Sequence, residues 1–217
     1  MRPYLQYYFA ALTKYQVHPP FVFEFLTDVF EDNRFYHFFG VIENYRRNLL
    51  GNSSQLQTEK GRITTNQLVK QLAITPKIGE ILFKSVHLYK PDTLLEIGNS
   101  LGISTLYQAV PNSAASMYTI IPDKVIAKAT QNYFKQLGTR NIQLLSGDIE
   151  PNLQKAIKTL SSIEFLFFNG FWGKESTLNY FETCLAYLPP IAVFVFKTPY
   201  ATKATTGSKC RTLKLSF

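Results

Sequence analysis

Residues 94–105 have the sequence LLEIGNSLGIST, and this stretch decides the fold. An apolar run leads to Glu96, a turn carries Gly98 and Gly102, and the residues that follow suit a helix. Glycine allows a tight turn and a close approach of the backbone to a ligand. The spacing E-x-G-x-x-x-G differs from the G-x-G-x-x-G of dinucleotide-binding folds. The stretch therefore predicts a strand, a turn and a helix, with a ligand that places no pyrophosphate at the helix start.

The chain after residue 92 alternates between short apolar runs and amphipathic segments. We expect strands at 93–97, 116–121, 142–145, 163–168 and 191–196, and helices at 104–110, 125–137, 153–160 and 178–188. The last two strands, IEFLFF and IAVFVF, are apolar at almost every position, as strands buried on both faces are. This pattern predicts an α/β fold with a Rossmann-like, doubly wound, mostly parallel sheet that helices cover on both sides.

The first part of the chain has a different composition. We expect residues 1–66 to form a helical N-terminal extension and a polar loop, and residues 67–217 to form the α/β domain with a basic C-terminal tail. Aromatic residues crowd the start of the chain, which predicts helices that pack through their rings. A surface for a partner or an apolar substrate is the alternative. The polar stretch 51–66 predicts an exposed loop that could act as a lid.

The net charge of +8 raises the question of nucleic-acid binding. Five positive charges and no acidic residue follow Phe196, namely Lys197, Lys203, Lys209, Arg211 and Lys214. Because the basicity is concentrated at the end of the chain, a solvated tail is favoured over a nucleic-acid-binding surface.

The two cysteines and the hydropathy pattern restrict the location of the protein. Cys184 and Cys210 lack metal-binding or redox spacing, and Cys184 fits the apolar side of a helix as a core thiol. No apolar run reaches the roughly 18 residues of a membrane span. The chain start lacks the pattern of a signal peptide. We expect a cytoplasmic protein.

Several segments together resemble a known family. They are LLEIGNSLGISTLYQA (94–109), YTI (118–120), NYFKQLG (132–138), NIQLLSGD (141–148), IEFLFFNG (163–170) and KESTLNYFETCLAYL (174–188). In order and spacing they resemble class I S-adenosylmethionine-dependent methyltransferases, in particular bacterial O-methyltransferases, with degenerate motifs. VHPPFVFEFL resembles the helical extension that some bacterial members carry.

The resemblance implies S-adenosylmethionine as the cofactor. The residues expected to contact it are Glu96, Gly98, Asn99, Ser100, Gly102, Asp148 and Asn169. Glu96, Gly98 and Gly102 match the motif that holds the methionine and ribose parts. Asp148 matches the acidic residue beside the adenine amine. Each acid also has a structural interpretation, as a helix cap or a solvated charge.

The chain departs from the family at the strand ends. The acidic residue that usually holds the ribose hydroxyls is replaced by Ile121, and Asp123 lies two residues later. Loss of a charge-assisted hydrogen-bond pair predicts weak cofactor binding. Where metal-using members place acidic or amide ligands, this chain has Asn169, Lys197 and Thr198. A hard cation needs several carboxylate oxygens, so we expect no metal.

Too few residues follow the last apolar strand for the two further strands of the family's sheet. An uncovered strand edge would favour pairing with a second chain, as in a homodimer. The leading functional hypothesis is metal-independent methyl transfer from S-adenosylmethionine to an unknown small acceptor, with unknown catalytic residues. The alternative is a non-catalytic methyltransferase-like protein that serves as a binding or interaction module.

Overall fold

The structure is a computed structural model that describes residues 20–58, 61–98, 101–170 and 174–197. Its contacts divide the chain into two compact units, residues 1–36 and 37–217. The boundary predicted after residue 66 stays a prediction.

The described part of the first unit is helical. Helix α2 (Pro20–Phe25) continues into one π-helical turn, η2 (Leu26–Phe30). The rings of Phe25 and Phe30 meet edge to face, with centroids 5.4 Å apart. The helical prediction for this segment is therefore confirmed, whereas the aromatic segment before it lies outside the described residues.

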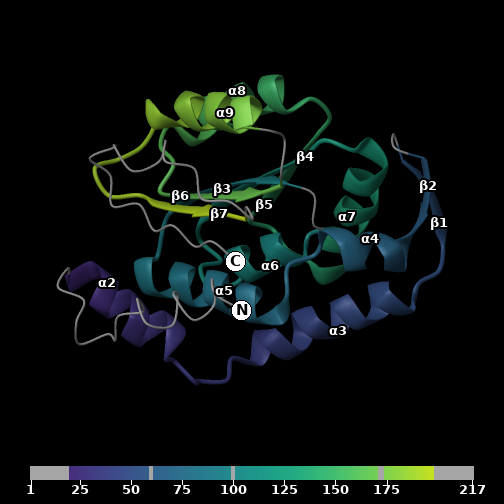
Figure 1. Ribbon diagram of the computed structural model, residues 1–217, viewed down its shortest axis with the longest axis horizontal. Coiled ribbons are helices and arrows are strands. Elements are labelled where there is room, and N and C mark those ends of the chain that lie inside the picture. The colour runs from purple at the N-terminus through teal and green to yellow at the C-terminus, as the bar shows by residue number, and fades with distance from the viewer. Residues whose placement is uncertain (1–19, 59–60, 99–100, 171–173, 198–217) are drawn as a thin grey trace, which may run out of the picture. The chain divides into compact units, whose positions relative to one another are not determined.

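A five-stranded parallel sheet forms the centre of the second unit (Figure 1). Its strands are β3 (Thr93–Gly98), β4 (Ser116–Ile121), β5 (Ile142–Ser146), β6 (Phe165–Asn169) and β7 (Val193–Phe196). They lie in the order β5-β4-β3-β6-β7, with every neighbouring pair parallel. The strand order reverses between β3 and β6. The predicted Rossmann-like fold is confirmed.

Helices cover both faces of this sheet (Figure 1). The helices α5 (Pro76–Tyr89), α6 (Ile103–Ala109) and α7 (Lys124–Leu137) lie on one side. The helices α8 (Ile149–Leu160) and α9 (Lys174–Leu185) lie on the other. Local signals begin and end them: the Thr75 side chain accepts from the Ile78 amide, and Gly138, with φ +66°, ends α7.

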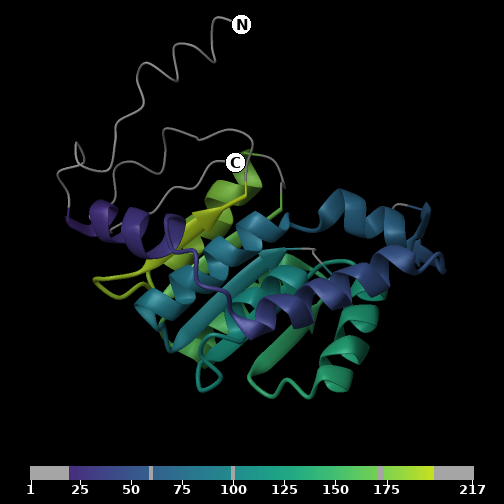
Figure 2. The same ribbon diagram turned by 90° about the horizontal axis from the view of Figure 1, so that it is seen from below.

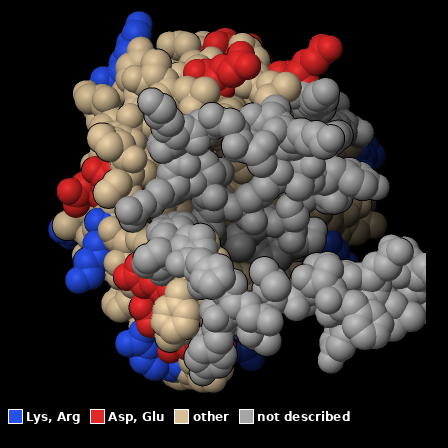
Figure 3. All heavy atoms as spheres, turned by 60° about the vertical axis from the view of Figure 1, so that its left-hand side comes forward, with Lys and Arg blue, Asp and Glu red and all other residues tan. Residues whose placement is uncertain are grey.

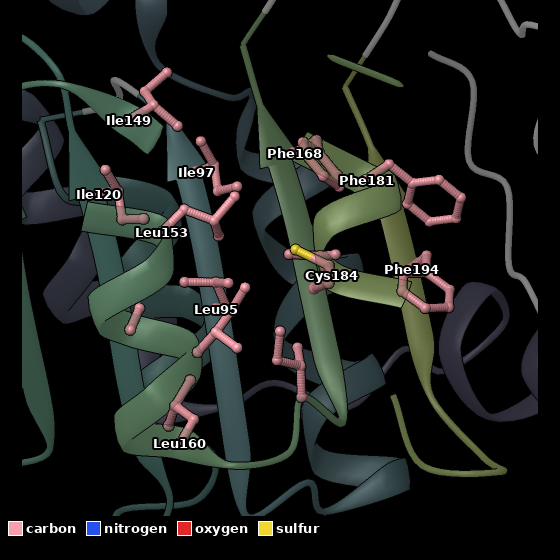
Figure 4. Packing of buried hydrophobic residues seen from close by; sticks show 14 of the residues in the cluster. Leu95, Ile97, Ile120, Ile149, Leu153, Leu160, Phe168, Phe181, Cys184 and Phe194 are labelled. Carbon is pink, nitrogen blue, oxygen red and sulfur yellow. The ribbon is translucent and has the colours of Figure 1, made fainter. Parts of the chain in front are cut away.

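Alternate side chains of β3 pack into the hydrophobic core between the sheet and the helices α8 and α9 (Figure 4). Leu95 and Ile97 belong to this cluster, together with Cys184 of α9. Successive side chains of a strand point to opposite faces, so Glu96 points toward α6. The prediction of a core thiol is confirmed, since Cys184 is fully buried and burial raises its pKa to about 12.

The polar stretch 51–66 is not the open loop that the composition predicts. It holds an antiparallel hairpin of β1 (Gln55–Thr58) and β2 (Gly61–Thr64), followed at once by α4 (Thr65–Leu72). The Thr64 amide donates to Gln67 Oε1 over 3.0 Å, as in a capping box, and so starts α4. Cross-strand pairing of polar residues leaves little hydrophobic pattern, which is why the prediction was wrong.

Helix α3 (His37–Gly51) contacts α4 and α6 on the side of the sheet toward which Glu96 points (Figure 2). Among the described helices, none combines the length and the apolar character that a membrane span requires. Basic and acidic side chains are interspersed over the described surface seen in Figure 3.

Candidate functional site

The candidate site lies where the carboxyl ends of β3 and β6 meet. In open α/β sheets, ligands bind outside the carboxyl ends of the strands, at the point where the strand order reverses. Gly98 and Asn169 are the register partners at this point. Both residues were predicted from the sequence as site residues, and the structure brings them together.

The carboxylate of Glu96 is fully enclosed by hydrogen-bond donors. Its Oε1 accepts from the Ser104 hydroxyl and from Asn169 Nδ2, the latter over 2.9 Å. Its Oε2 accepts from Thr105 Oγ1 over 2.8 Å and from Gln108 Nε2 over 3.0 Å. Only 1% of Glu96 is exposed. The carboxylate therefore ties β3 to both α6 and β6.

Burial and hydrogen bonding act on Glu96 in opposite directions. Burial raises the pKa of Glu96, and the hydrogen bonds from Ser104 and its neighbours lower it. Because both oxygens of Glu96 are occupied by side-chain donors of the protein itself, we interpret Glu96 as a structural residue that holds β3, α6 and β6 together. Direct contact between Glu96 and the cofactor stays a prediction.

Two buried acceptors beside this carboxylate lack a hydrogen-bond partner among the described residues. They are Asn169 Oδ1 and Gln108 Oε1, and both belong to amides whose NH₂ group donates to Glu96. A buried acceptor without a donor is unfavourable unless a ligand or water supplies one. Asn169 Oδ1, at the strand end, is a candidate contact for a donor group of a ligand.

The two glycines of the turn are explained by packing within the protein. A Cβ on Gly98 would lie 2.6 Å from both the Cβ and the carbonyl oxygen of Asn169. A Cβ on Gly102 would lie 2.7 Å from the Phe134 ring and 2.8 Å from Thr130 Cγ2, and its φ is +78°. The close approach that these glycines permit is therefore an approach to β6 and α7. Asn99 and Ser100, between them, lie outside the described residues.

The acidic residues after β4 and β5 have different local roles. Asp123 caps α7, since its Oδ1 accepts from the amides of Val125 and Ile126 over 2.9 and 3.1 Å. Asp148 stands at the N-cap position of α8 but makes no side-chain capping bond, and it is exposed. Ile121 is 1% exposed. At the end of β4, Ile121 has no carboxylate for the ribose hydroxyls, and the carboxylate of Asp123 already caps α7.

Lys197 follows β7 and so lies at the carboxyl ends of the strands, as the candidate site does. Its backbone amide donates to the Phe168 carbonyl over 2.9 Å, and its Nζ donates to the Leu72 carbonyl over 2.9 Å. Burial lowers the pKa of Lys197, and the negative charge of Glu96 opposes that effect. The predicted solvated tail therefore does not begin at Lys197, which is partly buried.

The α6 side chains that hold Glu96 were not predicted from the sequence. Ser104, Thr105 and Gln108 are all buried, although each is a polar residue type. Their spacing places Ser104 and Gln108 on one side of the helix, four residues apart. A polar face on a helix that follows a buried glutamate was the signal available in the sequence. In the described residues, no group of three or more histidine, cysteine, aspartate or glutamate side chains could hold a metal ion.

Comparison with solved structures shows the fold. The O-methyltransferase from Bacillus cereus in complex with SAH matches with a TM-score of 0.54 and 17% identity, over 78% of this chain and 68% of that one. TomG from Streptomyces achromogenes, an O-methyltransferase of tomaymycin synthesis in complex with SAM, matches with a TM-score of 0.56 and 17% identity, over 78% and 70% of the two chains. The cofactor-bound protein Rv0187 from MTB matches with a TM-score of 0.58 and 16% identity, over 83% and 73%.

The chain has the methyltransferase-like Rossmann fold. No protein-family model matches it, and the search of curated proteins found no match. The chain spans about two thirds of the length of these methyltransferase structures.

The described residues offer acceptor atoms for two of the three parts of S-adenosylmethionine, and contact with the cofactor stays a prediction. No described residue donates to Asn169 Oδ1, and the methionine part carries an ammonium group that donates. The Asp148 carboxylate, which is expected beside the adenine amine, is exposed and able to accept a hydrogen bond. At the ribose part the fit fails, because Ile121 offers no acceptor.

Proposed function

We propose that the protein binds S-adenosylmethionine weakly at the carboxyl ends of β3 and β6. We further propose that it transfers the methyl group to a small acceptor without a divalent ion. The observation that carries this proposal is the hydrogen bond between Asn169 and the buried Glu96 at the strand-order reversal of a methyltransferase-like fold.

The roles of individual residues follow from their surroundings. Asn169 would accept from the ammonium group of the methionine part, and the negative charge of Glu96 beneath it favours a cation there. The turn from Gly98 to Gly102, with Asn99 and Ser100, would hold the same part through its backbone. Asp148 would accept from the adenine amine.

When bound, S-adenosylmethionine supplies a methyl group activated by its sulfonium. The protein then has to hold the acceptor in line with that group. Positioning of this kind can carry much of the rate when the acceptor is already nucleophilic. The proposal therefore needs no catalytic carboxylate. A cytoplasmic location and a homodimer paired through a sheet edge stay predictions.

One observation favours a second function, a non-catalytic binding or interaction module. The β4 end lacks a ribose-binding acid, since Ile121 is buried and Asp123 caps α7. A protein that had lost cofactor binding would tolerate this replacement.

Calorimetric titration of the whole chain with S-adenosylmethionine and with S-adenosylhomocysteine separates the two functions. We expect both ligands to bind, with affinity weaker than the low micromolar range because the ribose contact is lost. A binder can then be assayed for transfer of a labelled methyl group to pools of phenols, thiols and amines. Absence of binding by either ligand would overturn the methyltransferase proposal in favour of the non-catalytic module.

A further inference from the structure

A buried tyrosine far away in the sequence contacts the turn after β3. Tyr45 of α3 is 2% exposed, and its hydroxyl donates to the carbonyl oxygen of Leu101 over 2.7 Å. Leu101 itself is 1% exposed. This carbonyl therefore depends on Tyr45 for a donor among the described residues.

The ring of Tyr45 is held by a second helix. It stacks on Tyr133 of α7, with ring centroids 3.3 Å apart and planes 11° apart. Burial raises the pKa of Tyr45, and Tyr133 adds to this rise, so the hydroxyl stays protonated and able to donate. The hydroxyl is thus fixed in place by α3 and α7 together.

The backbone that Tyr45 contacts is in an uncommon conformation. Leu101 has φ +55° and Gly102 has φ +78°, so two successive residues are left-handed. A leucine adopts this conformation only where its surroundings hold it. Tyr45 holds the carbonyl of Leu101, and Phe134 and Thr130 of α7 pack against Gly102.

This turn sets the start of α6. The helix begins at Ile103, and its residues Ser104 and Thr105 donate to Glu96. A change at Leu101 would therefore be transmitted to the hydrogen bonds at the strand-order reversal. A ligand that binds a preformed turn avoids the free energy of ordering it.

We infer that Tyr45 is a positioning residue of the cofactor site, which fixes Leu101 and Gly102, the described residues just before α6, through the carbonyl of Leu101. The inference rests on the proposed function for its ligand and on the described contacts for its geometry. A purely structural Tyr45 would affect unfolding without affecting affinity.

The chain supplies a matched control for this inference. Tyr107 of α6 is fully buried, and its hydroxyl donates to Glu43 of α3 over 2.8 Å. Its bond joins α6 to α3, as the bond of Tyr45 joins α3 to the residue before the N-cap of α6, but it does not involve the turn. Tyr45→Phe and Tyr107→Phe each remove one buried hydroxyl and keep the ring.

The experiment measures calorimetric affinity for S-adenosylmethionine and S-adenosylhomocysteine, together with thermal unfolding without ligand, for the wild type and both variants. We expect both variants to lower the unfolding temperature. We expect Tyr45→Phe to weaken both ligands by roughly tenfold, and Tyr107→Phe to leave both affinities within about twofold of wild type. Equal affinities in all three proteins would overturn the inference.

Amide hydrogen exchange of the ligand-free proteins separates this inference from the proposed function. Tyr45→Phe should speed exchange at the start of α6 relative to Tyr107→Phe, because the turn is no longer held. If the wild type binds neither ligand, the proposed function and the cofactor role of Tyr45 both fall. Unchanged exchange in Tyr45→Phe would show that Tyr45 does not hold the turn, whatever the wild type binds.

Discussion

The side-chain amide of Asn169, at the end of β6, donates to the carboxylate of Glu96 on β3 over 2.9 Å. The same amide donates to Ser104 Oγ over 2.8 Å, and Ser104 in turn donates to Glu96. Two strands and one helix are thus joined around a single buried charge. The bonds span 73 residues of sequence and meet at the point where the strand order reverses.

Replacement of Glu96 should change how stability depends on pH. Burial raises the pKa of Glu96 above its ordinary value of 4.5, so the folded protein holds this proton more tightly than the unfolded chain does. Stability therefore falls as the pH rises from the ordinary value through the folded pKa, and the loss is complete above it. A glutamine at position 96 does not titrate, so the pH dependence of stability that Glu96 causes should be absent from the variant Glu96→Gln. Urea unfolding at a series of pH values, from about 4 to about 8, measures it.

Asn169 explains why Glu96→Gln should still fold. Its Oδ1 lacks a partner among the described residues, so after a flip of the Asn169 amide this oxygen can accept from the new NH₂ group at position 96, while the Ser104 hydroxyl turns to donate to it. A pH profile identical to that of the wild type would contradict the assignment of this dependence to Glu96.

The packing role of Gly102 predicts a large cost for an added methyl group. Gly102→Ala meets the Phe134 ring and forces an alanine to φ +78°. Gly138→Ala forces a similar conformation, φ +66°, with nothing within 4 Å of the new Cβ. The control should lose about 1 kcal/mol of stability, and Gly102→Ala should lose a further 1 to 3 kcal/mol or so through overpacking. Equal losses in denaturant unfolding would show that α7 yields to the methyl group.

The sequence predicted the sheet because its strands carry strong local signals. Apolar runs such as those of β6 and β7 are buried on both faces, and this burial produces the pattern itself. The start of α8 was placed four residues late, at 153 in place of Ile149. The helix in fact includes Pro151 in its first turn, where proline is tolerated because the amide that it lacks would have no partner within the helix.

The contacts of the site could not be predicted from local signals. The pairing of Glu96 with Asn169 requires that β6 lie next to β3, and one sequence does not state which strands are neighbours. The contact of Tyr45 with Leu101 likewise depends on where α3 packs. The glycines were recognised, but the backbone and rings that they approach became known only from the fold.

The two aspartates at helix starts should respond in opposite ways to removal of the carboxylate. Asp123→Ala removes a cap with two hydrogen bonds to α7 and should cost about 1 kcal/mol of stability. Asp148→Ala removes no capping bond and should leave stability almost unchanged. In calorimetric titration, Asp148→Ala should weaken S-adenosylmethionine by about tenfold if it contacts the adenine amine. Full affinity in Asp148→Ala would exclude that contact.

Divalent ions should not affect ligand binding. The described residues contain no acidic or imidazole cluster that could hold a metal ion, and Lys197 places a positive charge at the end of β7. Titrations with S-adenosylhomocysteine in the presence of magnesium or of a chelator should give equal affinities. A clearly higher affinity in the presence of magnesium would contradict the prediction that the residues at the strand ends bind no metal ion.

Lys197 should lower the preference for the cofactor over its demethylated product. S-adenosylmethionine carries a sulfonium, whereas S-adenosylhomocysteine carries a neutral sulfur, so the two ligands differ by one positive charge. Lys197 follows β7 at the carboxyl ends of the strands, where the ligand is proposed to bind. The positive charge of its ammonium disfavours the positive charge of the sulfonium. Lys197→Met should therefore tighten S-adenosylmethionine relative to S-adenosylhomocysteine by a few-fold, which corresponds to roughly 1 kcal/mol or less.

The control for this prediction is Lys90→Met, which removes the same charge near the amino end of β3, at the end of the sheet away from the proposed ligand. Lys90 is exposed and precedes the start of β3. It should leave the ratio of the two affinities unchanged, because solvent and distance screen its charge. The measurement is a pair of calorimetric titrations for each protein. If Lys197→Met leaves the ratio at the wild-type value, or both lysine variants shift it equally, the sulfonium does not bind near the end of β7.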